Sequence, residues 1–112
     1  MKTHNVQSTP ITAEGIKLAI ERDGVEIARG FLYVLYNGLH DEPFGFLEDI
    51  YVIEKFRNKG YGVRIIQAAM KEAIQHGCYK LIGTSRNGKT KHHDLCVRAG
   101  FEKYGIEFRM NL

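Results

Sequence analysis

Apolar and polar positions along the chain repeat with two periods. In five stretches every second residue is apolar, or the run is rich in β-branched and aromatic side chains, which is the pattern of a β-strand. These predicted strands cover residues 16–21, 25–36, 46–52, 79–84 and 101–110. The turn residues Arg22-Asp23-Gly24 join the first two strands into a hairpin. Residues 1–15 lack a clear period and predict a flexible start with one short strand near Val6.

The second period is helical and occurs twice. After Gly62 apolar residues recur at every third or fourth position, and Gly77 then ends the helix as a left-handed cap. The apolar face of this helix is predicted to comprise Val63, Ile66, Ala69, Met70, Ala73 and Ile74. A shorter helix is predicted over residues 91–99, with Gly100 as its cap. Loops are expected over residues 37–45 and 86–89.

The order of these elements indicates the fold class. A strand, a helix and a strand in succession imply a parallel pair of strands with a right-handed crossover. Together with the hairpin, this pair predicts an α/β protein with a mixed sheet. A chain of 112 residues suffices for one domain with a modest core, so residues 1–112 are expected to form a single domain.

Composition restricts the classes of partner. The net charge of +3 permits an anionic ligand but falls short of a dedicated nucleic-acid binder. No run of about 18 apolar residues is present to span a membrane, and the first residues lack the apolar centre of a signal peptide. A soluble, cytoplasmic protein is therefore expected. Cys78 and Cys96 form no C-x-x-C motif and are expected to be free thiols.

The segment Arg57-Asn58-Lys59-Gly60-Tyr61-Gly62 lies between a predicted strand and the first predicted helix. The first N–H groups of a helix have no partners within it, and with the positive end of the helix dipole they attract an anion. Gly60 and Gly62 let a phosphate approach the backbone, while Arg57 and Lys59 add positive charge. We therefore expect a phosphate or pyrophosphate here. A basic turn with a glycine-rich helix start explains the same residues without a ligand.

Two stretches resemble the signatures of a known family. Residues Leu47-Glu48-Asp49-Ile50-Tyr51-Val52, followed by Phe56-Arg57-Asn58-Lys59-Gly60-Tyr61-Gly62, resemble the core motif of the GNAT N-acetyltransferases. The run LEDIYV is most similar to the spermidine/spermine branch. Residues 94–101 are similar to the second family signature, a helix that ends in Gly-Phe. The resemblance implies acetyl-CoA as cofactor and a small cationic amine, polyamine- or aminoglycoside-like, as substrate.

The resemblance also implies how the cofactor is held and what is missing. Backbone groups of Ile50 and Val52 would bind the pantetheine arm as an added strand would, and residues 57–62 would bind the pyrophosphate. Family members usually place two helices between their first two strands, and the residues before Ile16 are too few to supply them. We expect a compact GNAT-like fold that lacks these two helices. Its acceptor site would be open, or completed by a second subunit in a homodimer.

Acetyl transfer to an amine requires a base, because a primary amine with a pKa near 10.4 is neutral in only about one molecule in 2,500 at pH 7. Glu48 and Asp49 are the candidates. Adjacent strand residues point to opposite faces, so only one of them addresses the cleft unless a bulge intervenes. By the resemblance, Glu48 is the base or positions a water. Asp49 would bind the far end of a cationic acceptor, or be solvated.

The departing thiolate benefits from an acid, and GNAT enzymes often have a tyrosine four residues before the glycine of the Gly-Phe pair. Cys96 occupies that position here. A thiol with a pKa near 8.5 can protonate a thiolate of similar basicity, but buried cysteine is commonly an inert core residue, so both roles stay open. His92 and Cys96 lie four residues apart without a third ligand at a recognisable spacing, so no metal site is expected.

Two other functions fit the same residues. The missing helices and the cysteine in place of tyrosine fit a GNAT-fold module that binds acyl-CoA without turnover. An open acceptor cleft fits an acetyltransferase that acts on protein amines.

Overall fold

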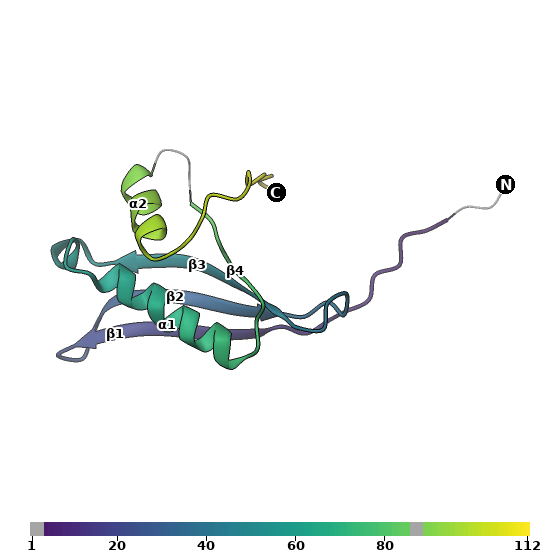
Figure 1. Ribbon diagram of the computed structural model, residues 1–112, viewed down its shortest axis with the longest axis horizontal. Coiled ribbons are helices and arrows are strands. Elements are labelled where there is room, and N and C mark those ends of the chain that lie inside the picture. Colours follow the sequence, from purple (N-terminus) through teal and green to yellow (C-terminus); the bar gives the residue numbers. More distant parts are fainter. Residues whose placement is uncertain (1–3, 86–88) are drawn as a thin grey trace.

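The fold is described by a computed structural model, which covers residues 4–85 and 89–112. The elements in chain order are β1 (Glu14–Arg22), β2 (Val25–Leu35), β3 (Phe44–Val52), the 3-10 helix η1 (Glu54–Phe56), α1 (Tyr61–Gln75), β4 (Leu81–Gly83) and α2 (Thr90–Arg98). Within the described residues the strands form one sheet in the order β1-β2-β3-β4 (Figure 1). β1 with β2 and β2 with β3 are antiparallel, while β3 and β4 are parallel and joined through α1. The predicted mixed α/β sheet is confirmed.

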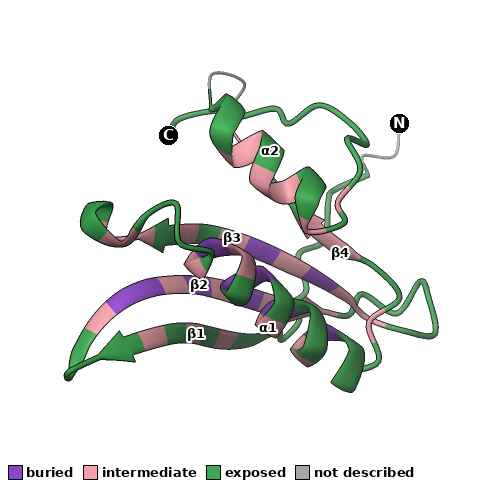
Figure 2. Cartoon of the chain, turned by 60° about the vertical axis from the view of Figure 1, so that its left-hand side comes forward, coloured by how far each residue is buried: buried purple, intermediate pink, exposed green. Residues whose placement is uncertain are grey.

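α1 covers one face of the sheet, which we call the near face (Figure 2). Its buried residues follow the spacing of an amphipathic helix. They are Gly62, Ile65, Ile66, Ala69 and Ala73. Ile66 and Ala69 pack against Leu47 of β3 in the centre of the core. Met70 and Ile74 of the predicted apolar face are exposed instead, because each lies about 100° further round the helix than a buried alanine.

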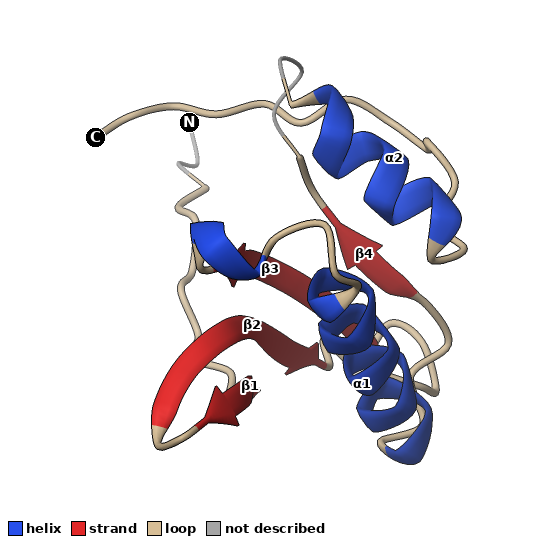
Figure 3. Ribbon diagram, turned by 90° about the vertical axis from the view of Figure 1, so that its left-hand side faces the viewer, coloured by secondary structure: helices blue, strands red, loops and turns tan. Residues whose placement is uncertain are grey.

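The opposite face of the sheet, which we call the far face, is also apolar. The strand register pairs Tyr33 with Phe46, Leu35 with Phe44, and Phe46 with Ile82, so these side chains lie on one face. All five are half-buried. Figure 3 shows α1 on the other side of the sheet. The far face therefore presents aromatic side chains that α1 does not cover.

Two of the predicted strands are wrong. Residues 4–13 contain no strand, and residues 101–112 contain none either. The alternation of apolar side chains near the C-terminus is present in the sequence, but a strand forms only when another strand supplies its hydrogen-bond partners. The local pattern therefore predicted a strand, but it could not show whether a second strand would lie beside it to supply hydrogen bonds.

Other boundaries shift by a few residues. β4 is shorter than the predicted strand over 79–84, and β3 begins at Phe44, inside the predicted loop. The loop predicted over 86–89 falls largely on residues 86–88, which lie outside the described residues.

Along residues 4–85 and 89–112, no helix combines the length and the apolar character that a bilayer crossing requires.

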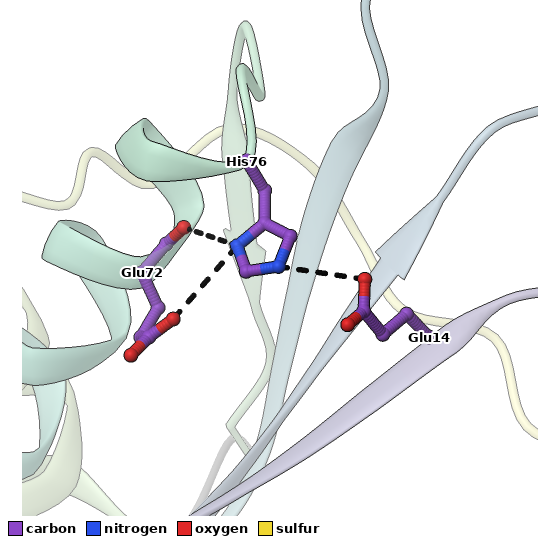
Figure 4. Close-up of polar contacts among 3 residues, drawn as sticks. All are labelled: Glu14, Glu72 and His76. Carbon is purple, nitrogen blue, oxygen red and sulfur yellow. Dashed lines mark hydrogen bonds and ion pairs between the residues drawn. The ribbon is translucent and has the colours of Figure 1, made fainter.

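His76 ties the end of α1 to the start of β1. Its Nδ1–H donates to the carbonyl oxygen of Glu72 at 2.8 Å, and its Nε2 lies 3.4 Å from Oε2 of Glu14 (Figure 4). The hydrogen bond to Glu72, and after it the negative charge of Glu14, raise the pKa of His76 above its ordinary value although desolvation opposes them. A cation at this end of a helix is also favoured by the helix dipole.

Candidate active site

β3 carries a bulge where it pairs with β2. The register slips between Arg29 and Phe31, so two residues of β3, Asp49 and Ile50, stand opposite Gly30 alone. Asp49 has a φ of 53°, in the left-handed region that the first residue of one class of bulge adopts. A bulge breaks the strict alternation of side chains along a strand. Two neighbouring side chains can then address the same side.

A small cavity of about 20 Å³ lies beside this bulge, where β3, β4 and α2 meet. It is lined by Leu47, Glu48, Asp49, Ile50, Gly83, Thr84, His92, Cys96 and Phe101. Both candidate residues therefore line the same cavity, Glu48 half-buried and Asp49 exposed. A volume of this size holds about one water molecule. Glu48, Asp49, Ile50 and Cys96, which the sequence singled out, are thus brought together.

The cavity forms because β3 and β4 separate. β4 pairs only with Gly45–Leu47, and its last residue, Gly83, lies opposite Leu47. From Glu48 onward, β3 has no partner strand on this edge among residues 4–85 and 89–112. Phe101 closes the gap, since its ring would lie 3.6 Å from a Cβ placed at Gly83.

The open edge of β3 presents backbone groups at alternate residues. The N–H of Ile53 donates to the carbonyl of Ile27 at 2.9 Å, so residue 53 faces β2, and Val52 faces the open edge. Arg57 Nε donates to the Val52 carbonyl at 2.8 Å, so that oxygen already has a partner. Of the two predicted pantetheine contacts, Val52 therefore offers its N–H to the open edge, while Ile50 lies in the bulge, where the alternation is interrupted.

His92 stands in the cavity wall one helical turn before Cys96. Its Nδ1 lies 2.8 Å from the hydroxyl of Ser85, which fixes the ring. Burial, and then the charges of His93 and Lys89, lower the pKa of His92, so its imidazole is neutral near neutral pH and can accept a proton. The spacing of His92 and Cys96 showed that they share a helix face. It did not show that this face lines the same cavity as Glu48 and Asp49.

Cys96 lies in the cavity wall rather than in the centre of the core. Burial raises the pKa of its thiol, which therefore keeps its proton at neutral pH. Cys78 and Cys96 are both free thiols. Within the part of the chain that the structure describes, no group of three His, Cys, Asp or Glu side chains is arranged to hold a metal ion.

The turn between η1 and α1 is shaped by residues in the left-handed region. Asn58 has a φ of 62° and Gly60 a φ of 88°. Gly60 is the N-cap of α1, and the helix's first internal hydrogen bond runs from Arg64 N–H to the Gly60 carbonyl at 3.1 Å. Gly60 has no side chain that could cap the N–H groups of residues 61–63. These groups are the ones that attract an anion at a helix start.

Glycine was expected at positions 60 and 62 because it lets a phosphate approach the backbone. The structure shows a different reason for glycine at each position. A Cβ at Gly60 would meet nothing within 4 Å, so glycine is favoured there by the positive φ. A Cβ at Gly62 would lie 2.9 Å from Cδ2 of Leu95. The missing side chain at Gly62 therefore lets α2 pack closely against the first turn of α1. Neither observation changes the N–H groups of residues 61–63, which Gly60 has no side chain to cap.

Basic side chains from the β1–β2 hairpin and from the turn gather around two aromatic rings. Arg29 and Arg57 lie over the ring of Tyr51, with guanidinium carbons 4.8 and 5.4 Å from its centroid. Three cations lie 5.4–5.7 Å from the ring of Phe56, namely Arg22, Lys55 and Lys59. Such contacts hold cations in place beside the start of α1. Arg22 and Arg29 were missed from the sequence, because only the hairpin brings them here.

The chain is similar to known acetyltransferases. The model of the "Acetyltransferase (GNAT) family" matches residues 7–101. Aminoglycoside N(6′)-acetyltransferase type 1 of Serratia marcescens is 39% identical over 76 residues, which are 68% of this chain and 51% of that protein. Glucosamine 6-phosphate N-acetyltransferase 1 of Dictyostelium discoideum is 34% identical over 68 residues, 61% of this chain and 41% of that protein.

A solved structure shares the fold. AAC(6′)-Iy in complex with the bisubstrate analogue CoA-S-monomethyl-acetylneamine superposes with a TM-score of 0.72 at 24% identity. The match covers 88% of this chain and 70% of that one. The chain spans only about half the length of the two relatives above, 41% and 51%.

Proposed function

The chain belongs to the acetyltransferase (GNAT) family, and on that basis we propose that it transfers an acetyl group from acetyl-CoA to a small cationic amine. The observation that carries the proposal is that three features lie one after another along the molecule. The path that joins them begins at the carboxylates of the cavity, follows the open edge of β3 and ends at the basic start of α1. It offers a proton acceptor, backbone hydrogen-bond groups and an anion site.

The far end of this path fits the phosphates of the cofactor. The N–H groups of residues 61–63, with Arg57 and Lys59, bind the pyrophosphate, and Asn58 and Gly60 hold the turn in shape. Backbone groups on the open edge of β3 bind the pantetheine arm. Acetyl-CoA supplies an acetyl group activated as a thioester. The CoA-containing analogue in the structure of AAC(6′)-Iy supports this choice of cofactor.

Glu48 is the base in this proposal. The amine loses a proton as its nitrogen bonds to the acetyl carbon, and that proton needs an acceptor in the cavity. Glu48 is half-buried in the wall and takes the proton directly, or through the single water for which the cavity has room. Asp49 is exposed at the bulge and attracts a second cationic group of the acceptor.

Cys96 is the acid. As the carbon–sulfur bond breaks, the departing thiolate takes a proton, and the Cys96 thiol holds one because burial raises its pKa. His92, one turn away on the same wall, is a second group that can move a proton in the cavity. The cavity wall thus holds a candidate for each of the two proton transfers.

The acceptor we propose is an amine on a sugar. The two named relatives are an aminoglycoside acetyltransferase and a glucosamine 6-phosphate acetyltransferase, and both names specify such an amine. A polycationic aminoglycoside also suits the two acidic residues, Glu48 and Asp49, that line the cavity. The polyamine class rests on the LEDIYV motif alone and ranks second.

The test has two stages on the full chain. Titration calorimetry with acetyl-CoA measures cofactor binding. Release of the free CoA thiol is then followed with aminoglycosides, glucosamine 6-phosphate, polyamines and lysine peptides in turn. Glu48→Gln should leave acetyl-CoA affinity unchanged and lower release at neutral pH by about a hundredfold. The matched control, Glu21→Gln on exposed β1, should change neither quantity. An unaltered pH–rate profile for Glu48→Gln would remove Glu48 as the base.

Binding of acyl-CoA without turnover is the second candidate. It is favoured by the small cavity, which has room for about one water and little more. Calorimetric binding without thiol release on any amine would establish it. Release with lysine peptides alone would instead assign a protein acceptor.

A further inference from the structure

Four residues of β2 and β3 form a group on the far face of the sheet. Leu32 pairs with Leu47, which packs against α1, and these two leucines are 0% and 2% exposed. Because side chains alternate along a strand, the residues next to the leucines point to the far face. They are Phe31 and Tyr33 of β2, and Phe46 and Glu48 of β3, all half-buried. The bulge of β3 lies beyond Glu48 and does not interrupt this alternation.

The strand register brings these four side chains together. Phe31 stands opposite Glu48, and Tyr33 stands opposite Phe46. Opposed residues of an antiparallel pair have Cβ atoms about 4.5–5.5 Å apart, so a ring on one strand reaches the side chain on the other. We call the three rings, Phe31, Tyr33 and Phe46, the aromatic block. Glu48 stands at one end of this block and also lines the cavity of the candidate active site.

The ring of Tyr33 leans across the neighbouring strand β1. Gly15 stands opposite Tyr33, and a Cβ placed at Gly15 would lie 3.4 Å from Cε1 and 3.5 Å from Cδ1 of the tyrosine. The ring therefore occupies space that a larger residue at position 15 would fill. Because Gly15 has no side chain and is itself exposed, the aromatic block stays open on the side of β1.

The aromatic block differs from the other rings of the chain in its charged neighbours. Cations of the chain lie 4.8–5.7 Å from the ring centroids of Phe44, Tyr51, Phe56, Tyr61 and Tyr79. Within residues 4–85 and 89–112, no such contact involves the aromatic block. Lys17, which stands opposite Phe31 on β1, is bound to Glu26 at 2.6 Å instead. The charged residue next to these rings is therefore the acidic Glu48.

Aromatic faces beside a carboxylate suit one kind of ligand. The negative face of a ring attracts an ammonium ion, and a carboxylate nearby adds to that attraction. The C–H groups of a sugar ring also form an apolar surface that can pack on an aromatic ring, while its polar groups bond elsewhere. An amino-substituted sugar combines the two properties. A linear polyamine has the cations but lacks the ring.

We propose that the aromatic block binds the acceptor, with the sugar ring packed on Phe31, Tyr33 and Phe46 and the reacting amine at Glu48. The role of Glu48 rests on the acetyl transfer proposed above. The aromatic block adds the selection of a cyclic acceptor over a linear one. Acceptor and cofactor then approach the cavity from different directions, because the cofactor lies along the open edge of β3.

Titration calorimetry of the full chain with neamine, an amine-bearing sugar pair, tests the binding. Tyr33→Ala should weaken neamine binding by about threefold to thirtyfold, the range expected for one cation–π contact. Tyr33→Phe keeps the ring and should leave the affinity unchanged. The matched control Tyr36→Ala, at a residue 52% exposed just beyond β2, should do the same. Equal neamine affinities for Tyr33→Ala and Tyr36→Ala would refute the aromatic block as the binding surface.

A second variant leaves all three rings in place. Gly15→Val puts a side chain where the Tyr33 ring leans, and valine is well suited to a strand. The displaced ring should weaken neamine binding by about threefold or more. Circular dichroism checks that the sheet is retained. An unchanged neamine affinity in a folded Gly15→Val chain would contradict the proposal.

Spermidine tests the preference for a ring. It is cationic but linear, so Tyr33→Ala should weaken its binding less than that of neamine. An equal or larger loss for spermidine would overturn the assignment of a cyclic acceptor.

The binding surface and the acetyl transfer fail separately. If neamine affinity depends on Tyr33 but no amine releases the CoA thiol, the aromatic block stands and the proposed function is wrong. If neamine releases the thiol and Tyr33→Ala changes neither its KM nor its affinity, the proposed function stands and the aromatic block is refuted. Both proposals require a raised KM for neamine in Tyr33→Ala, with kcat changed much less.

Discussion

Gly30→Ala is the sharpest probe of the bulge that opens the site. A Cβ at position 30 would lie 2.7 Å from Cγ2 of Ile65, whose side chain is 2% exposed in the core. Overpacking of this kind costs roughly 1–3 kcal/mol. Replacing a glycine within a strand returns about 0.5–1 kcal/mol, since alanine is less flexible in the unfolded chain. The net loss expected is therefore about 0–2.5 kcal/mol, with a middle value of about 1.3 kcal/mol.

Urea denaturation of the full chain measures this loss, and a matched control isolates its cause. Gly15→Ala on β1 meets only the ring of Tyr33 at 3.4 Å, near an ordinary contact, and should be neutral or slightly stabilising. Ile65→Leu removes the methyl group that clashes while nearly conserving volume, so the double variant should recover part of the loss. If Gly30→Ala is as stable as Gly15→Ala, the close packing of α1 over the bulge does not constrain the site.

Three further predictions follow from the charges and thiols of the molecule. Lys59→Gln should weaken acetyl-CoA binding by about threefold to tenfold at low salt and by less at high salt. The control Lys71→Gln, on the exposed side of α1, should leave acetyl-CoA binding unchanged. Calorimetry at two salt concentrations measures both effects. The folded-state pKa of His76 is raised, so the stabilisation it provides is complete below the unfolded value of 6.5 and is lost as the pH rises through the folded pKa. His76→Gln should thus lower the melting temperature in acid more than in alkali, and an equal loss at all pH values would contradict this. Burial raises the pKa of Cys96, so iodoacetamide should label it more slowly at neutral pH than a free thiol; rapid labelling followed by mass spectrometry would refute that environment.

Local patterns predicted most of the framework. The alternation of Ile16, Leu18 and Ile20 marked β1, and the helical spacing that ends at Gly77 marked α1. Both patterns arise from burial of one face, which leaves a period in the sequence. The same reasoning failed at residues 101–110, because period alone does not show whether an edge is available to pair with.

The candidate site was predictable only in part. The turn at Arg57 and Gly60 follows from a strand, a basic segment and a helix, which lie together in the sequence. The bulge at Asp49 depends on how β2 and β3 pair, and a register shift leaves no local signal. Arg22 joins the basic cluster through the hairpin, and His92 lines the same cavity as Glu48 and Asp49 only through the packing of α2. These placements are tertiary, so the amino-acid pattern around each residue could not show them.

The loose attachment of α2 bears on the acyl-group selectivity of the proposed acetyl transfer. Every residue of this helix keeps some exposure, and its contacts with the remainder include Leu95 against Gly62 and, just beyond its end, Phe101 against Gly83. The opposing wall belongs to β3, which pairs with β2 and is anchored in the core through Leu47. Laboratory evolution toward propionyl or bulkier donors would therefore advance fastest through substitutions that let α2 recede, while the carboxylate-bearing strand keeps its position.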